Sequence, residues 1–342
     1  MERMLAATIR DVAKKAKVGV GTVSRVLNDH PSVSPETKEK VLATIEQLDY
    51  VPNPVAQRLS RGRTHTISVV LPYLTIPSFV ERLRGVQNVL DLSEYDLVLY
   101  SAENPDRRDE LLNSLPRKAR TEGIIVISIC PDEEQVARIM DSDTPVVLVD
   151  VFHEALPSVY VNNVQGGWMA AKHLLDLGHK KIAFISDYLV NDFNFSAMQE
   201  RFTGYQQALS EANLSFDPNY HREVPHDRDQ AKEAALELLQ LSDRPTAIFA
   251  SSDIQGIGVL AAAREMGLSV PEDLSVIGFD GVRDSEYVHL TTVKQPLFVS
   301  GVTGTEVLLK AIEDQSFETQ QIQLELELIT RETTDKLLNA KS

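Results

Sequence analysis

Cysteine, tryptophan and long apolar stretches are scarce or missing in this chain of 342 residues, which has one Cys and one Trp. The lone Cys130 excludes an intramolecular disulfide framework and a cysteine-rich zinc site, and it fits a reducing compartment. No run approaches the roughly 18 apolar residues that a membrane helix needs. The first residues also lack the apolar stretch of a signal peptide. We therefore expect a cytoplasmic protein that does not enter a membrane.

Positive charge is also in short supply, since the net charge is −16, which taken alone argues against a nucleic-acid partner. Residues 1–63, however, hold eleven Lys and Arg against seven Asp and Glu, an excess of +4 that leaves −20 for the rest. A basic head on an acidic body attracts phosphate to one end only. Charge leaves two interpretations open: a nucleic-acid-binding head or a solvated basic surface.

Capping signals and apolar spacing predict three short helices in the basic head. Thr8 and Asp11 form a capping-box pattern, and Ser34 caps a third helix with Pro35 at its first position. Val18-Gly19 separates the first two helices, as in a helix-turn-helix module. The predicted inward faces are Ile9, Val12, Ala13 and Ala16; then Val23, Val26 and Leu27; then Val41, Leu42, Ile45 and Leu48.

In a helix-turn-helix module the second helix enters the major groove by its first residues. This helix would offer Val20, Gly21, Thr22, Ser24 and Arg25. Arg25 can bind guanine with two hydrogen bonds, worth about 1–3 kcal/mol of discrimination. Val20 can only contact a thymine methyl group, and Gly21 offers no side chain. The alternative is a three-helix bundle for protein docking, with Arg25 merely solvated.

A hinge helix is predicted over residues 53–63. The run Tyr50-Val51-Pro52-Asn53-Pro54 cannot continue a helix, because each proline disfavours helix at the residue before it. Asn53 can cap a new helix, which ends before Gly62. At about two turns this helix is too short to be stable alone. A leucine, Leu59, among arginines suits insertion into the minor groove.

Strands and helices alternate from residue 66 onward, which predicts parallel sheets with helices on both faces. The length of the whole chain suggests two or three domains at about 150 residues each. The body, with about 270 residues, is too long for one six-stranded sheet, so we expect two such lobes. The expected strands are 67–71, 97–100, 124–129, 146–149, 182–185, 247–250 and 276–279. The expected helices lie near 78–92, 106–119, 132–141, 197–212, 228–240 and 254–266.

The whole chain resembles the lactose/galactose repressor (LacI–GalR) family of bacterial transcription factors. The resemblance rests on motifs in the head, the hinge and the body: Thr8-Ile9-Arg10-Asp11-Val12-Ala13, Gly21-Thr22-Val23-Ser24-Arg25-Val26-Leu27-Asn28, Pro54-Val55-Ala56-Gln57-Arg58-Leu59, Val276-Ile277-Gly278-Phe279-Asp280 and Leu290-Thr291-Thr292-Val293-Lys294-Gln295-Pro296. It implies a homodimer that binds a pseudo-palindromic operator, with a leucine wedge at Leu59. The DNA contacts it implies are Thr8, Val20, Gly21, Thr22, Ser24, Arg25, Asn28, Asn53, Ala56 and Leu59.

The resemblance also implies a domain plan and departs from it in places. It predicts an all-α head at 1–52, a hinge at 53–63 and a core similar to periplasmic sugar-binding proteins at 64–335. The first lobe would comprise about 64–162 and 293–322, and the second about 163–292 and 323–335. Val20 and Gly21 stand where many family members have polar side chains that contact bases. The operator sequence therefore cannot be predicted from the family. Asn162 and Ser252 replace an Asp and an Asn that are frequent in the family. These differences weaken the assignment of any particular sugar from other family members.

A small-molecule effector, expected to be a sugar, would bind where strands end. Ser78 and Phe79 follow the first strand's turn, and Phe79 can supply an apolar wall. Arg201 lies where the family often binds hydroxyls or carboxylates. Asp253 and Asp280 fall just past strands, where a carboxylate can accept ligand hydroxyl protons, although Asp253 could instead cap its helix.

Catalysis is not expected, because no base–nucleophile pair, phosphate loop or metal-ligand spacing emerges. We therefore expect no cofactor and no metal. A periplasmic sugar receptor would share the body but would lack residues 1–63. A cytoplasmic sugar-processing enzyme could use the cleft carboxylates but lacks such a pair. The sequence favours a transcriptional regulator, with a repressor as the first interpretation.

Overall fold

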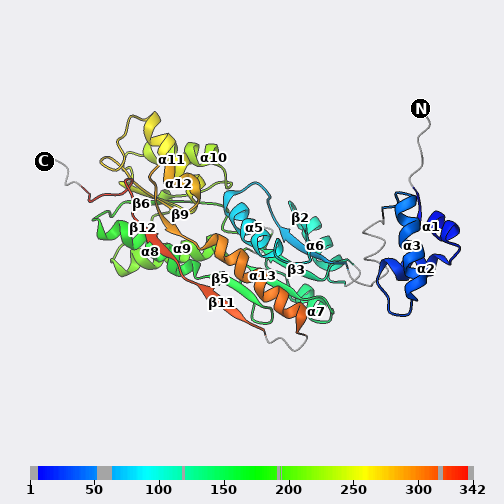
Figure 1. Ribbon diagram of the computed structural model, residues 1–342. Helices are drawn as coiled ribbons and strands as arrows, with labels where there is room; N and C mark the ends of the chain where they lie inside the picture. The colour runs from blue at the N-terminus through cyan, green and yellow to red at the C-terminus, as the bar shows by residue number, and fades with distance from the viewer. Residues whose placement is uncertain are drawn as a thin grey trace.

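The structure is a computed structural model that describes residues 7–51, 64–117, 120–190, 193, 195–314 and 319–337. The predicted hinge helix at 53–63, with Asn53, Ala56 and Leu59, lies outside the described residues. The described part of the chain has a helical head and a body with two β-sheets (Figure 1). Its helices are all too short or too polar to cross a lipid bilayer.

Three helices, α1 (Ile9–Ala16), α2 (Val20–Leu27) and α3 (Pro35–Gln47), make up the head. The predicted caps are present: Thr8 and Asp11 form a reciprocal capping box, and Ser34 accepts a hydrogen bond from the Thr37 amide. The small core contains Val12, Ala13, Ala16, Val23, Val26 and Val41. The prediction for Leu42 is wrong, since it is 46% exposed. Thr44 is buried instead, because it follows Val41 by three residues and so shares its face.

The first sheet has the strand order β11-β5-β4-β3-β1-β2, and its described pairs are parallel. Helices α5 and α13 cover one face, and α6 and α7 cover the other. Because helices cover both faces of the sheet, side chains on both sides of each central strand are buried. This explains why the sequences of these strands are continuous apolar runs. The strands are β1 (Thr66–Leu71), β2 (Asp96–Ser101), β3 (Gly123–Ile127), β4 (Val146–Val149), β5 (Ser158–Val161) and β11 (Gln321–Leu324). The helices are α5 (Pro77–Leu90), α6 (Pro105–Ser114), α7 (Glu133–Met140) and α13 (Leu297–Glu313).

The second sheet has the order β12-β10-β9-β8-β6-β7. Helices α10 and α11 cover one face, and α8 and α9 cover the other. The strands are β6 (Ile182–Ser186), β7 (His221–Glu223), β8 (Ala247–Ala250), β9 (Ser275–Asp280), β10 (Thr291–Lys294) and β12 (Glu327–Ile329). The helices are α8 (Asn163–Asp176), α9 (Ala197–Glu211), α10 (Arg228–Leu239), α11 (Asp253–Glu265) and α12 (Arg283–Tyr287), with a 3-10 turn at Pro218–Tyr220.

The chain passes between the two sheets three times, after β5, after β10 and after β11. The second and third crossings come two residues later than the predicted boundaries. Val293 and Lys294 still pair with β9 in the second sheet, and Gln323 and Leu324 still pair with β5 in the first. As a result α13 packs beside α5, far from it in sequence (Figure 1).

Two details differ from what the sequence predicts, one in strand direction and one in helix length. β12 runs antiparallel to β10, because β12 enters the second sheet from the first lobe whereas β10 leaves toward it. The helix expected near 106–119 ends at Ser114. The sequence also missed β5, β7, β10, β11 and β12, which have only three or four residues each and so carry little periodic signal.

Candidate functional site

The first turns of α2 present an uncovered face. Val23 and Val26 are buried in the core of the head, whereas Val20 is 44% exposed. A Cβ atom at Gly21 would meet no other atom within 4 Å. The other positions predicted to contact DNA on this helix are exposed or half-buried: Thr22, Ser24, Arg25 and Asn28. These side chains are therefore accessible for an external contact.

Thr8 caps the N-terminus of α1 in the head. Its hydroxyl donates to Asp11 Oδ2 at 2.6 Å, and its amide donates to the same oxygen at 2.9 Å. These hydrogen bonds lower the pKa of Asp11 and fix the start of α1. Thr8 remains exposed, so it can also reach a phosphate there. The other predicted contacts, Asn53, Ala56 and Leu59, lie outside the described residues.

A cleft of about 240 Å³ lies between the two lobes, at the ends of their strands. The first lobe contributes Ser78, Phe79, Arg82, Ser128 and Asp150. The second lobe contributes Asp187, Met198, Arg201, His226 and Asp280. Four of these residues, Ser78, Phe79, Arg201 and Asp280, are among the predicted effector contacts. The structure therefore brings together side chains that lie far apart in sequence.

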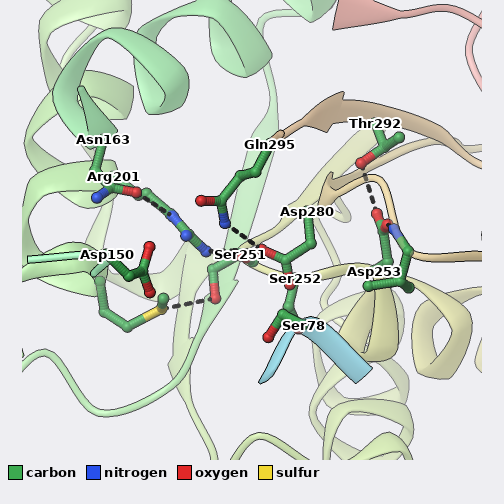
Figure 2. A network of polar contacts seen from close by, with 12 residues as sticks. Ser78, Asp150, Asn163, Arg201, Ser251, Ser252, Asp253, Asp280, Thr292 and Gln295 are labelled. Carbon is green, nitrogen blue, oxygen red and sulfur yellow. Dashed lines mark hydrogen bonds and ion pairs between the residues drawn. The ribbon is translucent and has the colours of Figure 1, made fainter. Parts of the chain in front are cut away.

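Arg201 and Asp280 form the charged part of the second-lobe wall (Figure 2). Arg201 Nε donates to Asn163 Oδ1 at 2.9 Å, and Nη1 donates to the Ser251 carbonyl at 2.6 Å. Arg201 Nη1 lies 3.7 Å from Asp280 Oδ1, and its guanidinium carbon lies 3.7 Å from the centre of the Phe279 ring. Burial lowers the pKa of Arg201 and raises the pKa of Asp280, while the charges of the pair oppose both shifts.

Close helix packing holds Arg201 in place. A Cβ atom at Gly167 of α8 would lie 2.0 Å from the Arg201 carbonyl oxygen, and one at Gly204 of α9 would lie 1.9 Å from the Val164 carbonyl oxygen. Only glycine allows the two backbones to approach this closely. The Arg201 side chain therefore starts from a fixed backbone position.

The first-lobe wall carries a buried ion pair that was not predicted from the sequence. Arg82 Nη2 pairs with Asp150 Oδ1, and both side chains are almost fully buried. Ser128 Oγ donates to Asp150 Oδ2 at 2.6 Å, and Arg82 Nη1 donates to the Ser78 carbonyl at 3.4 Å. The signals were present: Arg82 interrupts an apolar helix stripe, and Asp150 directly follows the strand at 146–149.

Gln295 joins the two walls. Its Oε1 accepts a hydrogen bond from Arg82 at 3.1 Å. Its Nε2 donates to Asp280 Oδ1 at 2.7 Å (Figure 2). Gln295 lies between β10 of the second lobe and α13 of the first. One amide therefore links the charged groups of both lobes at a crossover. Gln295 belongs to the sequence motif at 290–296, but no role was predicted for it.

A third polar pair and several aromatic rings complete the cleft. Burial raises the pKa of Asp187 and lowers the pKa of His226, while attraction between the two groups opposes both shifts. His226 Nε2 is buried and has no hydrogen-bond partner among the described residues. The Tyr73 ring lies 6.5 Å from the Phe79 ring and 6.0 Å from the Phe193 ring. These rings give the cleft an apolar wall beside its polar one.

Asp253 is not part of the cleft lining, contrary to the prediction. It is fully buried, and its Oδ1 accepts a hydrogen bond from the Thr292 hydroxyl at 2.6 Å (Figure 2). Its Oδ2 accepts from the Val282 amide at 2.8 Å. The alternative of a helix cap is also wrong, since Ser252 caps α11. Asp253 instead ties α11 to β10 and to the loop after β9.

Within the described ranges, no group of three His, Cys, Asp or Glu side chains could hold a metal ion. The cleft's two guanidiniums each have a carboxylate partner. Paired charges, hydroxyls and rings can orient a polar ring without changing its covalent bonds. The arrangement therefore suits reversible binding.

Comparison with known proteins identifies the family. A profile of bacterial regulatory proteins of the lacI family matches residues 8–53, and one of a periplasmic binding protein-like domain matches residues 171–334. Catabolite control protein A of Priestia megaterium is 36% identical over 332 residues, covering 96% of this chain and 99% of that protein. The chain belongs to the LacI family. Like other LacI members it is a transcriptional regulator and not an enzyme.

Solved structures of LacI proteins share the fold. The lac repressor dimer bound to operator and the anti-inducer ONPF is 27% identical, with a TM-score of 0.78, and covers 97% of this chain and 100% of its own. A transcriptional regulator CelR–cellobiose complex is 29% identical, with a TM-score of 0.69, covering 96% and 99%. The likeness spans the head and both lobes, so the fold class predicted from the sequence is confirmed.

Proposed function

We propose that this protein is a homodimeric repressor that binds a pseudo-palindromic operator and is controlled by a sugar held between its lobes. The observation that carries the proposal is the uncovered face of α2 beside Gly21 and Val20, on a head joined to a body with a polar cleft. At Val20 and Gly21 this face is open and does not pack into the core of the head. We also propose the cytoplasm as its location, since operator DNA is there.

Direct base contact is assigned to the outward-facing side chains of α2. Arg25 is exposed and can donate two hydrogen bonds to guanine in the major groove. Thr22 and Ser24 can contact a base edge or a phosphate, and Val20 can contact a thymine methyl group. Asn53, Ala56 and Leu59 are assigned to the hinge contacts, with Leu59 wedged into the minor groove.

Exposed apolar surface supports the homodimer. On the second lobe, Tyr287 is 70% exposed beside a hollow of about 560 Å³, whose lining includes Ile257 and Leu260 of α11 together with Arg264, His289 and Glu332. On the first lobe, Val80 of α5 and Phe298 and Val299 of α13 are exposed. Apolar side chains left exposed in this way are available for association with a second copy. The lac repressor, a structural neighbour, is a dimer on its operator.

The sugar assignment rests on the polar walls of the cleft. Arg201 and Asp280 can donate to and accept from ligand hydroxyls, while Phe79 can pack against the apolar face of a ring. Each such hydrogen bond contributes about 1 kcal/mol net, so several must act together. A structural neighbour that binds cellobiose supports this class of effector.

Effector binding would act through the lobe angle. A ligand that prefers one angle shifts the population toward it, and the angle sets how readily paired hinge helices order on DNA. A coupling of about 1–3 kcal/mol changes operator affinity by roughly 5–150-fold.

Selection of bound duplexes from a random pool by the full-length protein, followed by footprinting, tests the proposal. We expect a two-fold symmetric site and a steep loss of affinity with rising salt, because the head neutralises phosphates. Addition of a bound sugar should change that affinity. Absence of any symmetric footprint at low salt, with and without sugars, would reject the proposed function.

A further inference from the structure

Arg82 is a buried charge on an otherwise apolar helix face. Its side chain is almost fully buried on α5, beside Phe79 and Val86. The Nη atoms of Arg82 are occupied by Asp150, Gln295 and the Ser78 carbonyl. Arg82 Nε, in contrast, is buried and has no partner among the described residues. Because an unpaired buried donor destabilises the protein, it needs a water or ligand acceptor.

Two spaces border Arg82. One is the cleft of about 240 Å³, and the other is a void of about 10 Å³ near Pro296 and Ser300. The void is at the lower limit for one water molecule, about 10–15 Å³. The opposite wall of the cleft includes His226, whose buried Nε2 has no partner among the described residues. Two residues with an unpaired buried nitrogen, one from each lobe, therefore line the same cleft.

The charges around the cleft favour an uncharged ligand oxygen. Arg82 is already paired with Asp150, and Arg201 with Asp280. Asp187 adds a third carboxyl group to the lining. An anionic ligand would add negative charge near these carboxyl groups with no unpaired guanidinium to offset it. A hydroxyl oxygen can accept from Arg82 Nε without that cost.

The size of the cleft favours a single ring. Sites for drug-sized ligands occupy about 300–1,000 Å³, and this cleft is smaller. Phe79 and Tyr73 offer aromatic surface to one face of a ring. A polyhydroxylated ring would use both the apolar wall and the polar groups.

Building on the proposed function, we propose that Arg82 contacts the effector directly, with Nε donating to an uncharged oxygen of a single-ring, polyhydroxylated effector. The same guanidinium holds Gln295 at the β10–α13 crossover. A Cβ atom at Gly301 of α13 would lie 2.0 Å from the Arg82 carbonyl oxygen, so α5 and α13 touch through their backbones. Occupancy at Arg82 is thereby communicated to the segment that joins the lobes.

The test measures binding of defined probes to the full-length protein by calorimetry and thermal shift. Aldopentoses and aldohexoses, including D-ribose and D-glucose, are the neutral single-ring probes. Glucose 6-phosphate and glucuronate are the anionic probes, and cellobiose is the two-ring probe. We expect a neutral single-ring probe to bind most tightly and Arg82→Lys to weaken it at least about tenfold. Arg84→Lys, on the same helix but exposed in an ion pair with Glu81, is the matched control and should bind as wild type.

A second measurement covers the case in which Arg82→Lys folds poorly. Monodeoxy derivatives of the bound probe are tested on the wild-type protein, where one of them should lose about tenfold in affinity. The double variant Arg82→Gln/Asp150→Asn, which removes both charges together, should not distinguish that derivative from its parent. Equal discrimination in wild type and double variant would instead assign Nε to a water in the small void and overturn the proposal.

Three other results would also overturn it: unchanged probe affinity in a folded Arg82→Lys protein, preferential binding of an anionic or two-ring probe, or no binding of any neutral single-ring probe. Operator binding by the same samples distinguishes a failure of the Arg82 assignment from a failure of the proposed function. If the symmetric operator site is still bound, only the assignment of Arg82 fails. If operator binding is absent as well, the proposed function fails with it.

Discussion

Gln295 donates a 2.7 Å hydrogen bond to Asp280 at the point where the chain leaves the second sheet for the first. The same amide accepts from Arg82, so a single side chain connects an arginine of one lobe with a carboxylate of the other. Both hydrogen bonds are buried. A change in lobe angle must therefore stretch or exchange at least one of them.

Replacing Gln295→Leu should lower the free energy of unfolding by about 1–3 kcal/mol, because Asp280 and Arg82 each lose a buried partner. It should also weaken the effect of a bound sugar on operator affinity. Urea unfolding and operator titration with and without the sugar measure the two effects.

The control for this change is Gln240→Leu, at an exposed glutamine after α10, which should leave both quantities within error. Gln295→Glu keeps the acceptor for Arg82 but places a carboxyl group beside Asp280. A Gln295→Glu protein as stable as wild type at pH 8 would argue against the bridge.

Much of the architecture followed from the sequence, because its signals are local. The caps at Thr8 and Ser34 and the apolar runs of the central strands predict their elements without tertiary information. Short edge strands were missed, since a strand such as β7 gains its stability from pairing with β6 and not from its own three residues.

The cleft was harder to predict from the sequence than the fold. Asp280 was predicted from a strand end and Arg201 from the family resemblance, but the strand-end rule also pointed to Asp253, whose oxygens accept hydrogen bonds from Thr292 and Val282. The position of a residue after a strand predicts where its backbone lies. It does not predict which neighbours its side chain contacts. Arg82 was missed because its role depends on the approach of α5 to the crossover, which only the tertiary structure provides.

Arg25→Ala should relax base preference at one position of each operator half-site, at a cost of about 1–3 kcal/mol for the preferred base. Arg25 is exposed in the last turn of α2, from which its long side chain can reach a base edge. Titration against operators substituted singly at every position measures the change. Lys40→Ala, which removes one exposed charge from α3, should weaken all sequences alike. An unaltered preference profile in Arg25→Ala would remove Arg25 from base readout.

Gly21→Ala should stabilise α2 by up to about 1 kcal/mol, because glycine inside a helix is unfavourable relative to alanine and a Cβ there meets no atom within 4 Å. Hydrogen exchange of α2 amides in the full-length protein measures this. Gly19→Ala is the contrasting variant, since Gly19 is the N-cap and alanine is a poor cap. Faster exchange in Gly21→Ala would contradict the open surroundings of this position. A fall in operator affinity alone would indicate that the DNA backbone or a base comes close to Gly21.

Leu59→Ala should reduce DNA bending and weaken operator binding, because a methyl group cannot hold base steps apart as a leucine wedge can. Ring closure of short duplexes that contain the selected operator measures the bend. Val55→Ala, a truncation in the same predicted hinge helix, serves as the comparison and should bend DNA more than Leu59→Ala does. Identical bending by wild type and Leu59→Ala would reject the wedge.

Asp253 should make stability depend on pH. Burial, with repulsion from Asp280, raises the pKa of Asp253 from its ordinary 3.8 to about 8 in the folded protein. The folded state therefore holds this proton more tightly than the unfolded state, and the stability it contributes is present below about pH 4 and lost as pH rises toward 8. The slope from this group is at most about 1.4 kcal/mol per pH unit.

Asp253→Asn should remove that slope, so that urea unfolding between pH 5 and pH 8 shows a flatter profile than wild type. Asp284→Asn, at an exposed acid on α12, should keep the wild-type slope. Parallel profiles for wild type and Asp253→Asn would show that Asp253 is ionised in the folded protein and that its charge is compensated by the Thr292 hydroxyl and the Val282 amide.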